Sequence, residues 1–276
     1  MTEQKEKILE SVKYIQEKSP YKRNPSVALI TYKDASFLRE FKILKKLKYA
    51  EIPPTVIAGS EANDGELLYA SLKGTKHNLL IMNGRYNFYE GYTMRQVAHP
   101  IYTLRELGVK TIVLIDEVGY LNPRFNDGGI ALIYDHINLM GDNPLIGEND
   151  ETLGTRFPDM SNAYDYLLYD KIEKIFLDRN IKFYPSVYLG ITGPETETEA
   201  ECRFYREIGS DVLGYSLVPE NLAVVHSGMK CVAFGMMSRE LVADRLSEIS
   251  EEEQTKNRLK AEKTFTPLLK DMLSIL

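Results

Sequence analysis

The sequence is poor in cysteine, and it has neither a long apolar run nor an excess of positive charge. Cys202 and Cys231 are the only cysteines in 276 residues, too few for a disulfide framework and without the spacing of a metal site. Every apolar run is far shorter than the roughly 20 residues that a membrane-spanning helix needs. The net charge of −6 argues against a nucleic-acid partner, because phosphate backbones require a surplus of Lys and Arg. Residues 1–19 are charged rather than apolar, so we expect no signal peptide and a cytoplasmic location.

Common catalytic motifs are also missing. There is no G-x-x-x-x-G-K-[ST], no G-x-G-x-x-G after the first strand, no G-x-S-x-G and no H-E-x-x-H. The four histidines are scattered, and none forms a pair at metal-ligand spacing. His136 directly follows a predicted strand, but a structural hydrogen bond is its first interpretation. We therefore expect no metal site.

Strand-like and helix-like segments alternate along the chain. Amphipathic patterns predict a helix within 1–20, one from Thr93 to Leu107, one beginning at Ser161, and a C-terminal helix within 248–276 that is kinked at Pro267. No linker or repeat divides the sequence, so we expect one α/β domain over 1–276, with a mostly parallel or mixed sheet between helices. Short apolar runs predict the strands Ser26–Thr31, Asn78–Met82, Lys110–Ile115, Ile130–Tyr134, Val187–Thr192 and Cys231–Met236.

Three polar clusters follow predicted strands, at Asn83–Tyr92, Asp116–Asn122 and Thr192–Thr198. In α/β proteins ligands bind at the carboxyl ends of the strands. An arginine there can hold an oxyanion, and an aromatic side chain can cover a ring or sugar, although an arginine in a loop closes a salt bridge just as often. The clusters indicate a small-molecule site and leave its ligand open.

Four segments together resemble the trimeric purine nucleoside phosphorylases, a family that includes the methylthioadenosine phosphorylases. They occur in order within a similarity that runs from about Ser26 to Leu241 and covers most of the chain, and they include the specific D-H-I-N-L…N-P-L-x-G-x-N run. The segments are Asn83–Tyr92 (NGRYNFYEGY), Asp135–Asn149 (DHINLMGDNPLIGEN), Arg156–Tyr164 (RFPDMSNAY) and Gly193–Cys202 (GPETETEAEC).

The resemblance implies a single-domain α/β fold with a mixed, partly barrel-like sheet, the nucleoside phosphorylase fold, assembled as a homotrimer. Family members cleave purine nucleosides with phosphate as co-substrate, giving free base and pentose 1-phosphate without a metal or organic cofactor. The reaction passes through an oxocarbenium-like displacement, so phosphate and the leaving base both need preorganised donors. The implied partners are further copies of this chain, a nucleoside or base, and, if catalysis is lost, another protein.

Several positions match the family's substrate-binding residues. Arg85 and Ser216 match residues that contact phosphate, Tyr89 a tyrosine that faces the ribose, and Glu197 the purine-binding glutamate. By the same resemblance, Tyr188 and Tyr215 are also candidate substrate-binding residues, with Tyr215 in place of a ribose-facing methionine.

Other positions depart from the family pattern at the phosphate site. The family's Gly-Ser-Gly after the first strand is here Tyr32, Lys33 and Asp34, which removes two glycines. The segment Ala58–Gly65 lacks the family's histidine. The Asn-Ala-Ala-Gly-Gly turn becomes Asp116-Glu117-Val118-Gly119-Tyr120, which adds two carboxylates where an anion would bind.

Further departures affect catalysis and base binding. Asn87 replaces a histidine of the G-R-x-H motif, Thr196 replaces a phenylalanine, and Arg239 aligns with the asparagine that stabilises the leaving purine. One lost preorganised donor lowers a rate by ~10²–10³, and several are replaced together. No catalytic residue is therefore assigned.

Two hypotheses follow. The first is a family member whose phosphate and base sites are dismantled and which serves a binding or assembly role, with Tyr32 and Glu117 filling the phosphate site. The alternative is an active phosphorylase, or a hydrolase, of altered specificity. In that case Lys33 and Arg239 would be new ligand contacts, and Asp116 or Glu117 would act as the general base.

Overall fold

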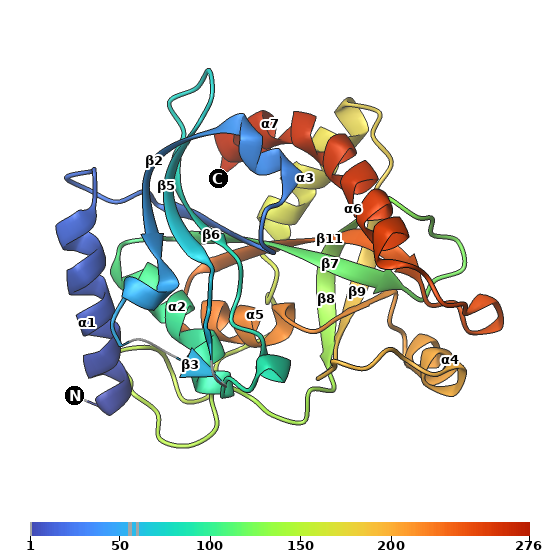
Figure 1. The fold of residues 1–276 in the computed structure, drawn as a ribbon, viewed down its shortest axis with the longest axis horizontal. Coiled ribbons are helices and arrows are strands. Elements are labelled where there is room, and N and C mark those ends of the chain that lie inside the picture. The colour runs from blue at the N-terminus through green and yellow to red at the C-terminus, as the bar shows by residue number, and fades with distance from the viewer. Residues whose placement is uncertain (1, 55–56, 59–60) are drawn as a thin grey trace.

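A mixed sheet of nine strands forms the centre of the protein (Figure 1). The computed structural model describes residues 2–54, 57–58 and 61–276. The strand order is β10-β9-β8-β11-β7-β1-β6-β5-β2. The strands span Val27–Thr31 (β1), Phe41–Lys48 (β2), Glu66–Leu72 (β5), Asn78–Asn83 (β6), Thr111–Tyr120 (β7), Ile130–Asn138 (β8), Tyr184–Gly190 (β9), Val212–Gly214 (β10) and Lys230–Glu240 (β11). The short strands β3 (Ile57–Ala58) and β4 (Glu61–Ala62) pair separately.

One half of the sheet closes on itself. Strand β10 pairs in parallel with β9 and in the antiparallel direction with β7, so that β7, β11, β8, β9 and β10 form a ring. The central pairs β1–β6, β1–β7 and β11–β7 are parallel, whereas β11–β8 and the outer β5 pairs are antiparallel. This confirms the expected single α/β domain with a mixed, partly barrel-like sheet.

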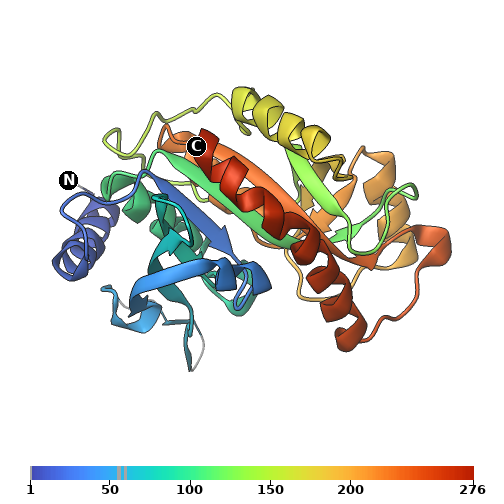
Figure 2. The same cartoon turned by 90° about the horizontal axis from the view of Figure 1, so that it is seen from above.

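Helices cover both faces of the sheet. One apolar cluster joins the sheet to α1, α2 and α5, and a second joins it to α3, α6 and α7. Figure 2 shows α6 and α7 crossing one face of the sheet, where α6 packs on β11. The helices span Glu3–Lys18 (α1), Met94–Glu106 (α2), Tyr166–Asp178 (α3), Glu199–Glu207 (α4), Leu217–His226 (α5), Glu251–Phe265 (α6) and Leu269–Ile275 (α7). In the part of the chain that the structure describes, no helix is both long enough and apolar enough to cross a membrane.

Several expected elements have different bounds, among them the predicted strands near β8, β9 and β11, and two further differences have a clear physical cause. Strand β7 continues through Asp116 to Tyr120, because β11 pairs along its length and β10 pairs with its end. The cluster after the third predicted strand is therefore strand rather than loop. Helix α3 begins at Tyr166 instead of Ser161, since the Asp165 side chain accepts from the Leu168 N–H and caps the helix there.

The C-terminal helix is interrupted as predicted. A short 3₁₀ turn, Thr266–Leu268, contains Pro267 and separates α6 from α7. Helix α6 begins after Ser250, with three exposed glutamates in its first turn. Its opposite side is buried, and Phe265 packs against Phe234 and Phe37 at ring separations of 5.0 and 5.8 Å.

Truncation of Phe265 tests whether this aromatic cluster holds α6 on the sheet. Replacing this fully buried side chain by Ala should lower the free energy of unfolding by about 3–5 kcal/mol, since it leaves a cavity. Leu259→Ala, on the exposed side of the same helix, should change it by less than about 1 kcal/mol. Chemical denaturation of both variants measures the difference. Equal losses would show that the cluster does not anchor α6.

Candidate functional site

A cavity of about 700 Å³ lies where β1, β6 and β7 carry the predicted polar residues. Strand ends supply the functional groups because parallel strands direct their carboxyl ends to one edge. Asp34, Tyr188 and Glu197 do not line this cavity. The predicted residues that line it are Tyr32, Lys33, Arg85, Asn87, Tyr89, Asp116, Glu117, Tyr215, Ser216 and Arg239.

The Arg85 side chain points into the protein and is bonded there. Its Nε donates to Glu220 Oε1 at 2.9 Å, Nη1 to the Ile115 carbonyl at 2.8 Å, and Nη2 to the Ile30 carbonyl at 3.3 Å. Only 3% of the side chain is exposed. All three guanidinium nitrogens therefore already have protein acceptors, from β1, β7 and α5.

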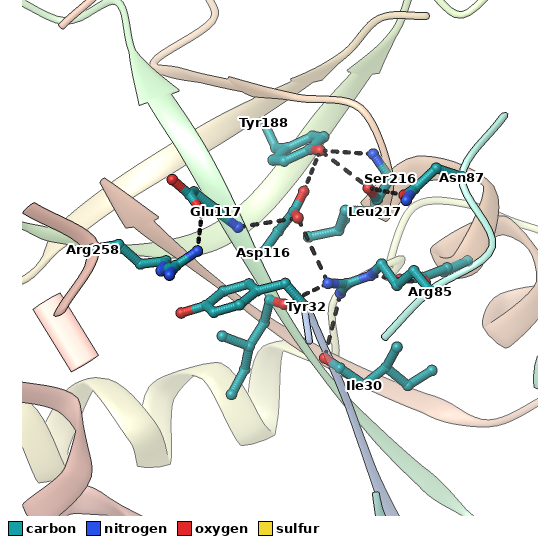
Figure 3. A network of polar contacts seen from close by, with 12 residues as sticks. Ile30, Tyr32, Arg85, Asn87, Asp116, Glu117, Tyr188, Ser216, Leu217 and Arg258 are labelled. Carbon is teal, nitrogen blue, oxygen red and sulfur yellow. Dashed lines mark hydrogen bonds and ion pairs between the residues drawn. The ribbon is translucent and has the colours of Figure 1, made fainter. Parts of the chain in front are cut away.

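Asp116 places a carboxylate beside this arginine (Figure 3). Its Oδ1 lies 3.6 Å from Arg85 Nη1, and its Oδ2 accepts from the Tyr188 hydroxyl at 2.7 Å. Tyr188 is fully buried, and its oxygen also accepts from the N–H of Ser216 at 3.4 Å. The site thus contains an anion of its own, held by a cation and a phenol.

The close approach of these groups depends on Gly214. A Cβ at that position would lie 2.3 Å from the Tyr188 hydroxyl and 2.8 Å from Asp116 Oδ2. Any side chain would therefore displace the hydrogen bond between Tyr188 and Asp116.

The buried cluster has more acid than base. Burial raises the pKa of Glu220 to about 7, although Arg85 opposes the shift, and burial likewise raises the pKa of Asp116. Burial disfavours the charge of Arg85, but Glu220 and Asp116 raise its pKa above the usual value. One cation faces two carboxylates, so the carboxyl groups keep a proton to a higher pH than they would in water.

Tyr32 and Glu117 are held at the cavity wall by α6. The Tyr32 hydroxyl donates to Glu262 Oε1 at 2.6 Å, and Glu117 Oε2 accepts from Arg258 Nη1 at 2.8 Å. The Arg258 guanidinium also lies 5.0 Å from the centre of the Tyr32 ring. Tyr32 and Glu117 both line the cavity, and their α6 partners hold the two side chains at its wall. That they fill the phosphate site stays a prediction.

The turn after β1 carries charged side chains where the family pattern has glycines. Asp34 adopts a φ of +58°, a left-handed conformation that side chains disfavour, and its N–H donates to Asn83 Oδ1 at 2.8 Å. Lys33 forms an ion pair with Asp64. Gly59 and Ser60, in the segment expected to contact phosphate, lie outside the described residues.

At the other end of the cavity, Arg239 and Tyr215 shield Glu197. The Arg239 Nη2 donates to Glu197 Oε1 at 3.1 Å and to the Tyr215 hydroxyl at 2.6 Å, and that hydroxyl donates to Glu197 Oε1 at 2.9 Å. The Glu197 side chain is 1% exposed and does not line the cavity. The groups that reach the cavity here are a guanidinium and a phenol.

Asn87, Tyr89 and Ser216 also line the cavity. Ser216, directly before α5, donates from Oγ to Asn87 Oδ1 at 2.9 Å. The Tyr89 ring meets the Tyr215 ring edge-on at 6.0 Å. His136 is not part of this site, since its Nδ1 lies 3.0 Å from the Tyr164 hydroxyl, a structural contact.

Sequence reasoning assigned no role to three residues that organise the site: Glu220, Arg258 and Glu262. Glu220 is the one carboxylate in the apolar start of α5, LVPENLA, a signal for a buried ion pair. Arg258 and Glu262 are separated by one helical turn of α6, but nothing in their spacing identifies Tyr32 or Glu117 as partners. Among the described residues, no group of three or more His, Cys, Asp or Glu side chains could hold a metal ion.

Comparison with known proteins identifies the family to which the chain belongs. The model of the phosphorylase superfamily matches residues 34–274. The chain is 38% identical over 256 residues to purine nucleoside phosphorylase 1 of Bacillus subtilis, covering 90% of this chain and 93% of that protein. It is 37% identical over 201 residues to the purine nucleoside phosphorylase of Bos taurus, covering 71% and 69%.

A solved structure shows the same fold. Isoform 2 of the Schistosoma mansoni purine nucleoside phosphorylase, in complex with cytosine and ribose-1-phosphate, has a TM-score of 0.89 and 28% identity, with 98% of this chain and 96% of that chain covered. The fold and site thus define a member of the phosphorylase superfamily. Within it, the chain belongs to the purine nucleoside phosphorylases, which confirms the resemblance found in the sequence motifs.

The raised pKa of Glu220 predicts a pH-dependent stability. Between the ordinary value of 4.5 and about 7, the folded protein binds a proton that the unfolded chain releases, so stability falls as the pH rises. Glutamine cannot titrate. The free energy of unfolding of the wild type minus that of Glu220→Gln should therefore fall by up to about 3 kcal/mol from pH 4.5 to 7.5.

Denaturant titrations at several pH values measure this difference. Glu207→Gln, an exposed position on α4, serves as the matched control and should give a pH-independent difference. A flat profile for Glu220→Gln as well would refute the shifted titration.

Proposed function

We propose that this chain is a purine nucleoside phosphorylase homologue that has lost phosphorolysis and keeps a binding or assembly role. The observation that carries the proposal is that the Arg85 guanidinium is hydrogen-bonded within the protein. Its three nitrogens donate to Glu220, Ile115 and Ile30. These bonds use three of the five guanidinium N–H groups, and a phosphate that reached the other two would meet Asp116, whose Oδ1 lies 3.6 Å from Nη1.

Electrostatics oppose phosphate at this place. A carboxylate ~4 Å from a bound anion costs ~4 kcal/mol per pair of charges at an effective dielectric constant of ~20. Asp116 and Glu117 both line the cavity. Arg85 and Arg258 do not remove this cost, because each already has a second carboxylate partner, Glu220 and Glu262.

The base end supports the same conclusion. A leaving purine needs a partner that stabilises negative charge while a glutamate accepts from its ring N–H. Here Glu197 is bonded to Arg239 and Tyr215, which occupy the positions between it and the cavity. Asn87 holds Ser216, the second residue expected to contact phosphate.

An active enzyme of altered specificity is the second candidate. The open cavity of about 700 Å³ favours it, because a nucleoside would fit among Tyr89, Ser216 and Tyr215. Hydrolysis would need no phosphate, and Asp116 could take a proton from water. Inosine, adenosine and hypoxanthine, named with Schistosoma relatives, are the first ligands to try.

A base-release assay separates these candidates. Purified protein with inosine, guanosine, adenosine or methylthioadenosine should release no free base, with or without phosphate, because Arg85 is bonded within the protein and Asp116 and Glu117 oppose a bound anion. Phosphate-dependent release that Arg85→Ala abolishes would contradict the proposal, and phosphate-independent release would favour the hydrolase.

Restoring the residues expected in the family provides the matched test. The variant Asp116→Asn, Glu117→Ala and Arg239→Asn should gain phosphate-dependent base release at least tenfold above the assay background, since it removes two carboxylates and uncovers Glu197. Asp178→Asn, an exposed change at a residue that does not line the cavity, controls for altered net charge. Failure of a folded triple variant to gain activity would weaken the electrostatic explanation.

We also propose that the protein is a homotrimer in the cytoplasm. The segment between β8 and α3 exposes apolar side chains, and Phe157 is 87% exposed. Both cysteines are free and buried, which suits a reducing compartment.

Light scattering after gel filtration tests the assembly. The wild type should have three times the 31.6 kDa mass of one chain, and Phe157→Ser should shift the protein towards monomer because it removes exposed apolar area. Thr155→Ser, a conservative change nearby, should leave the mass unaltered. A monomeric wild type would contradict the trimer.

A further inference from the structure

Strand β2 ends the nine-stranded sheet and, among the described residues, pairs with β5 alone (Figure 1). The Tyr49 N–H donates to the Gly65 carbonyl at 2.9 Å, which fixes the hydrogen-bonding side of β2. Because backbone groups alternate along a strand, the N–H and C=O groups of Lys46 and Lys48 point away from β5. The outer edge of β2 is therefore open to an added strand.

Four lysines lie along β2 and point to both faces of the sheet. Lys45 is paired with Tyr69, a member of the apolar cluster around α1, α2 and α5, whereas Lys46 is paired with Leu68, a member of the other cluster. Directly opposite residues of an antiparallel pair share a face, so Lys45 and Lys46 stand on opposite faces. A bulge at Leu44 shifts the alternation by one residue. The four lysines, all exposed, are Lys42, Lys45, Lys46 and Lys48.

These lysines give an acidic protein a basic edge. Lys46 pairs with Glu66 at 3.2 Å. In the part of the chain that the structure describes, none of Lys42, Lys45 and Lys48 forms an ion pair. The whole protein has a net charge of −6, so the surplus of positive charge on this strand is local and does not follow from the composition.

The charge of the edge decides which strand can be added to it. Two copies of this chain would place lysine opposite lysine if they joined through β2, and like charges directly opposite each other are destabilising. Edge lysines protect many proteins against such association. A strand with acidic side chains is favoured instead, because the Cβ atoms of directly opposite residues lie only ~5 Å apart.

We infer that β2 is a docking edge for an extended, acidic segment of another protein, which adds to the sheet as a further strand. Backbone hydrogen bonds to the open edge supply affinity, and the lysines on both faces select carboxylates. The four lysines do not line the cavity. The inference therefore goes beyond the proposed function and gives the binding role a surface of its own.

Fluorescence anisotropy with a labelled peptide tests this inference. The probe is a capped peptide that repeats Glu-Glu-Thr-Val, so that carboxylates stand on both of its faces when it is extended. It should bind at least tenfold more tightly than each of three controls. These are the peptide with Gln in place of Glu, the Glu peptide with every backbone nitrogen methylated, and an oligothymidylate of the same net charge.

The controls separate strand addition from simple attraction between charges. Binding of the acidic peptide should also weaken at least fivefold between about 50 and about 300 mM salt, since exposed charges are screened. The inference is overturned if the acidic peptide does not bind, if the methylated peptide binds equally well, or if the oligothymidylate binds as tightly.

Two substitutions of Lys48 separate its charge from its backbone. Lys48→Gln removes the charge alone, whereas Lys48→Pro removes the charge and the outward N–H. Proline suits this position because Lys48 has a φ of −68° and its N–H does not point to β5. Lys48→Pro should weaken the peptide at least threefold more than Lys48→Gln does. Equal affinities would overturn the inference, and if Lys48→Pro fails to fold, the methylated peptide still tests backbone pairing.

A double variant tests the contribution of both faces. Lys45→Gln with Lys48→Gln should lower the affinity for the acidic peptide at least tenfold, because it removes one lysine from each face. Lys171→Gln with Lys174→Gln, two exposed positions on α3, makes the same change in net charge and should leave the affinity within twofold. An equal loss in this control would overturn the inference.

The outcome is independent of the test for phosphorolysis. Base release in the enzymatic assay would refute the loss of catalysis and would leave the docking edge standing. A failure of the acidic peptide to bind, without base release, would refute only the docking edge.

Discussion

The buried ion pairs of Arg85 are the interaction on which the site depends. This one guanidinium joins β1 through the Ile30 carbonyl, β7 through the Ile115 carbonyl and α5 through Glu220. Breaking a buried pair by removing one partner is strongly destabilising, because the other charge stays behind without compensation. The arginine therefore cannot leave its partners freely to meet a ligand. We propose that a residue whose family counterpart contacts phosphate has become part of the framework around the cavity.

Helix α6 fixes the wall of the same cavity from the other side. Glu262 accepts from both the Tyr32 hydroxyl and the Ser36 N–H, each at 2.6 Å, and Arg258 holds Glu117. These contacts join residues near the start of the sheet to residues near the end of the chain. Because Phe265 anchors the helix in the apolar core, the polar contacts are made by an element that packing already positions. The charges at the wall are consequently set by tertiary structure.

Local patterns and family resemblance together predicted most of the fold. The apolar runs found β1, β6, β8 and β11 because buried strands need continuous apolar residues. Strand β10 has only three residues, Val212–Gly214, and its pairing with β7 depends on ring closure that no local pattern encodes. The apolar run that predicts β7 ends at Ile115, whereas β11 also pairs at Asp116 and Glu117, so the structure has a strand where the sequence indicated a loop.

The site was predictable as a set of residues but not as a set of contacts. Resemblance identified Arg85, Asp116 and Arg239 as positions of interest, and all three line the cavity. That Arg239 would bond Glu197 follows from β11 and the 193–198 turn meeting in space, which spacing along the chain does not reveal. The functional roles of these residues remain predictions.

The pairing of β7 on both sides has a consequence for how the protein can change. A carboxylate on a mobile loop can swing aside when an anion arrives, so its effect depends on a conformational equilibrium. Asp116 and Glu117 instead lie on a strand that pairs with β11 at both positions. The pairing with β11 holds the backbone at both residues, so the two carboxylates cannot be withdrawn by a loop movement. The negative charge at this wall of the cavity is therefore fixed by the sequence, and substitution rather than backbone movement would change it.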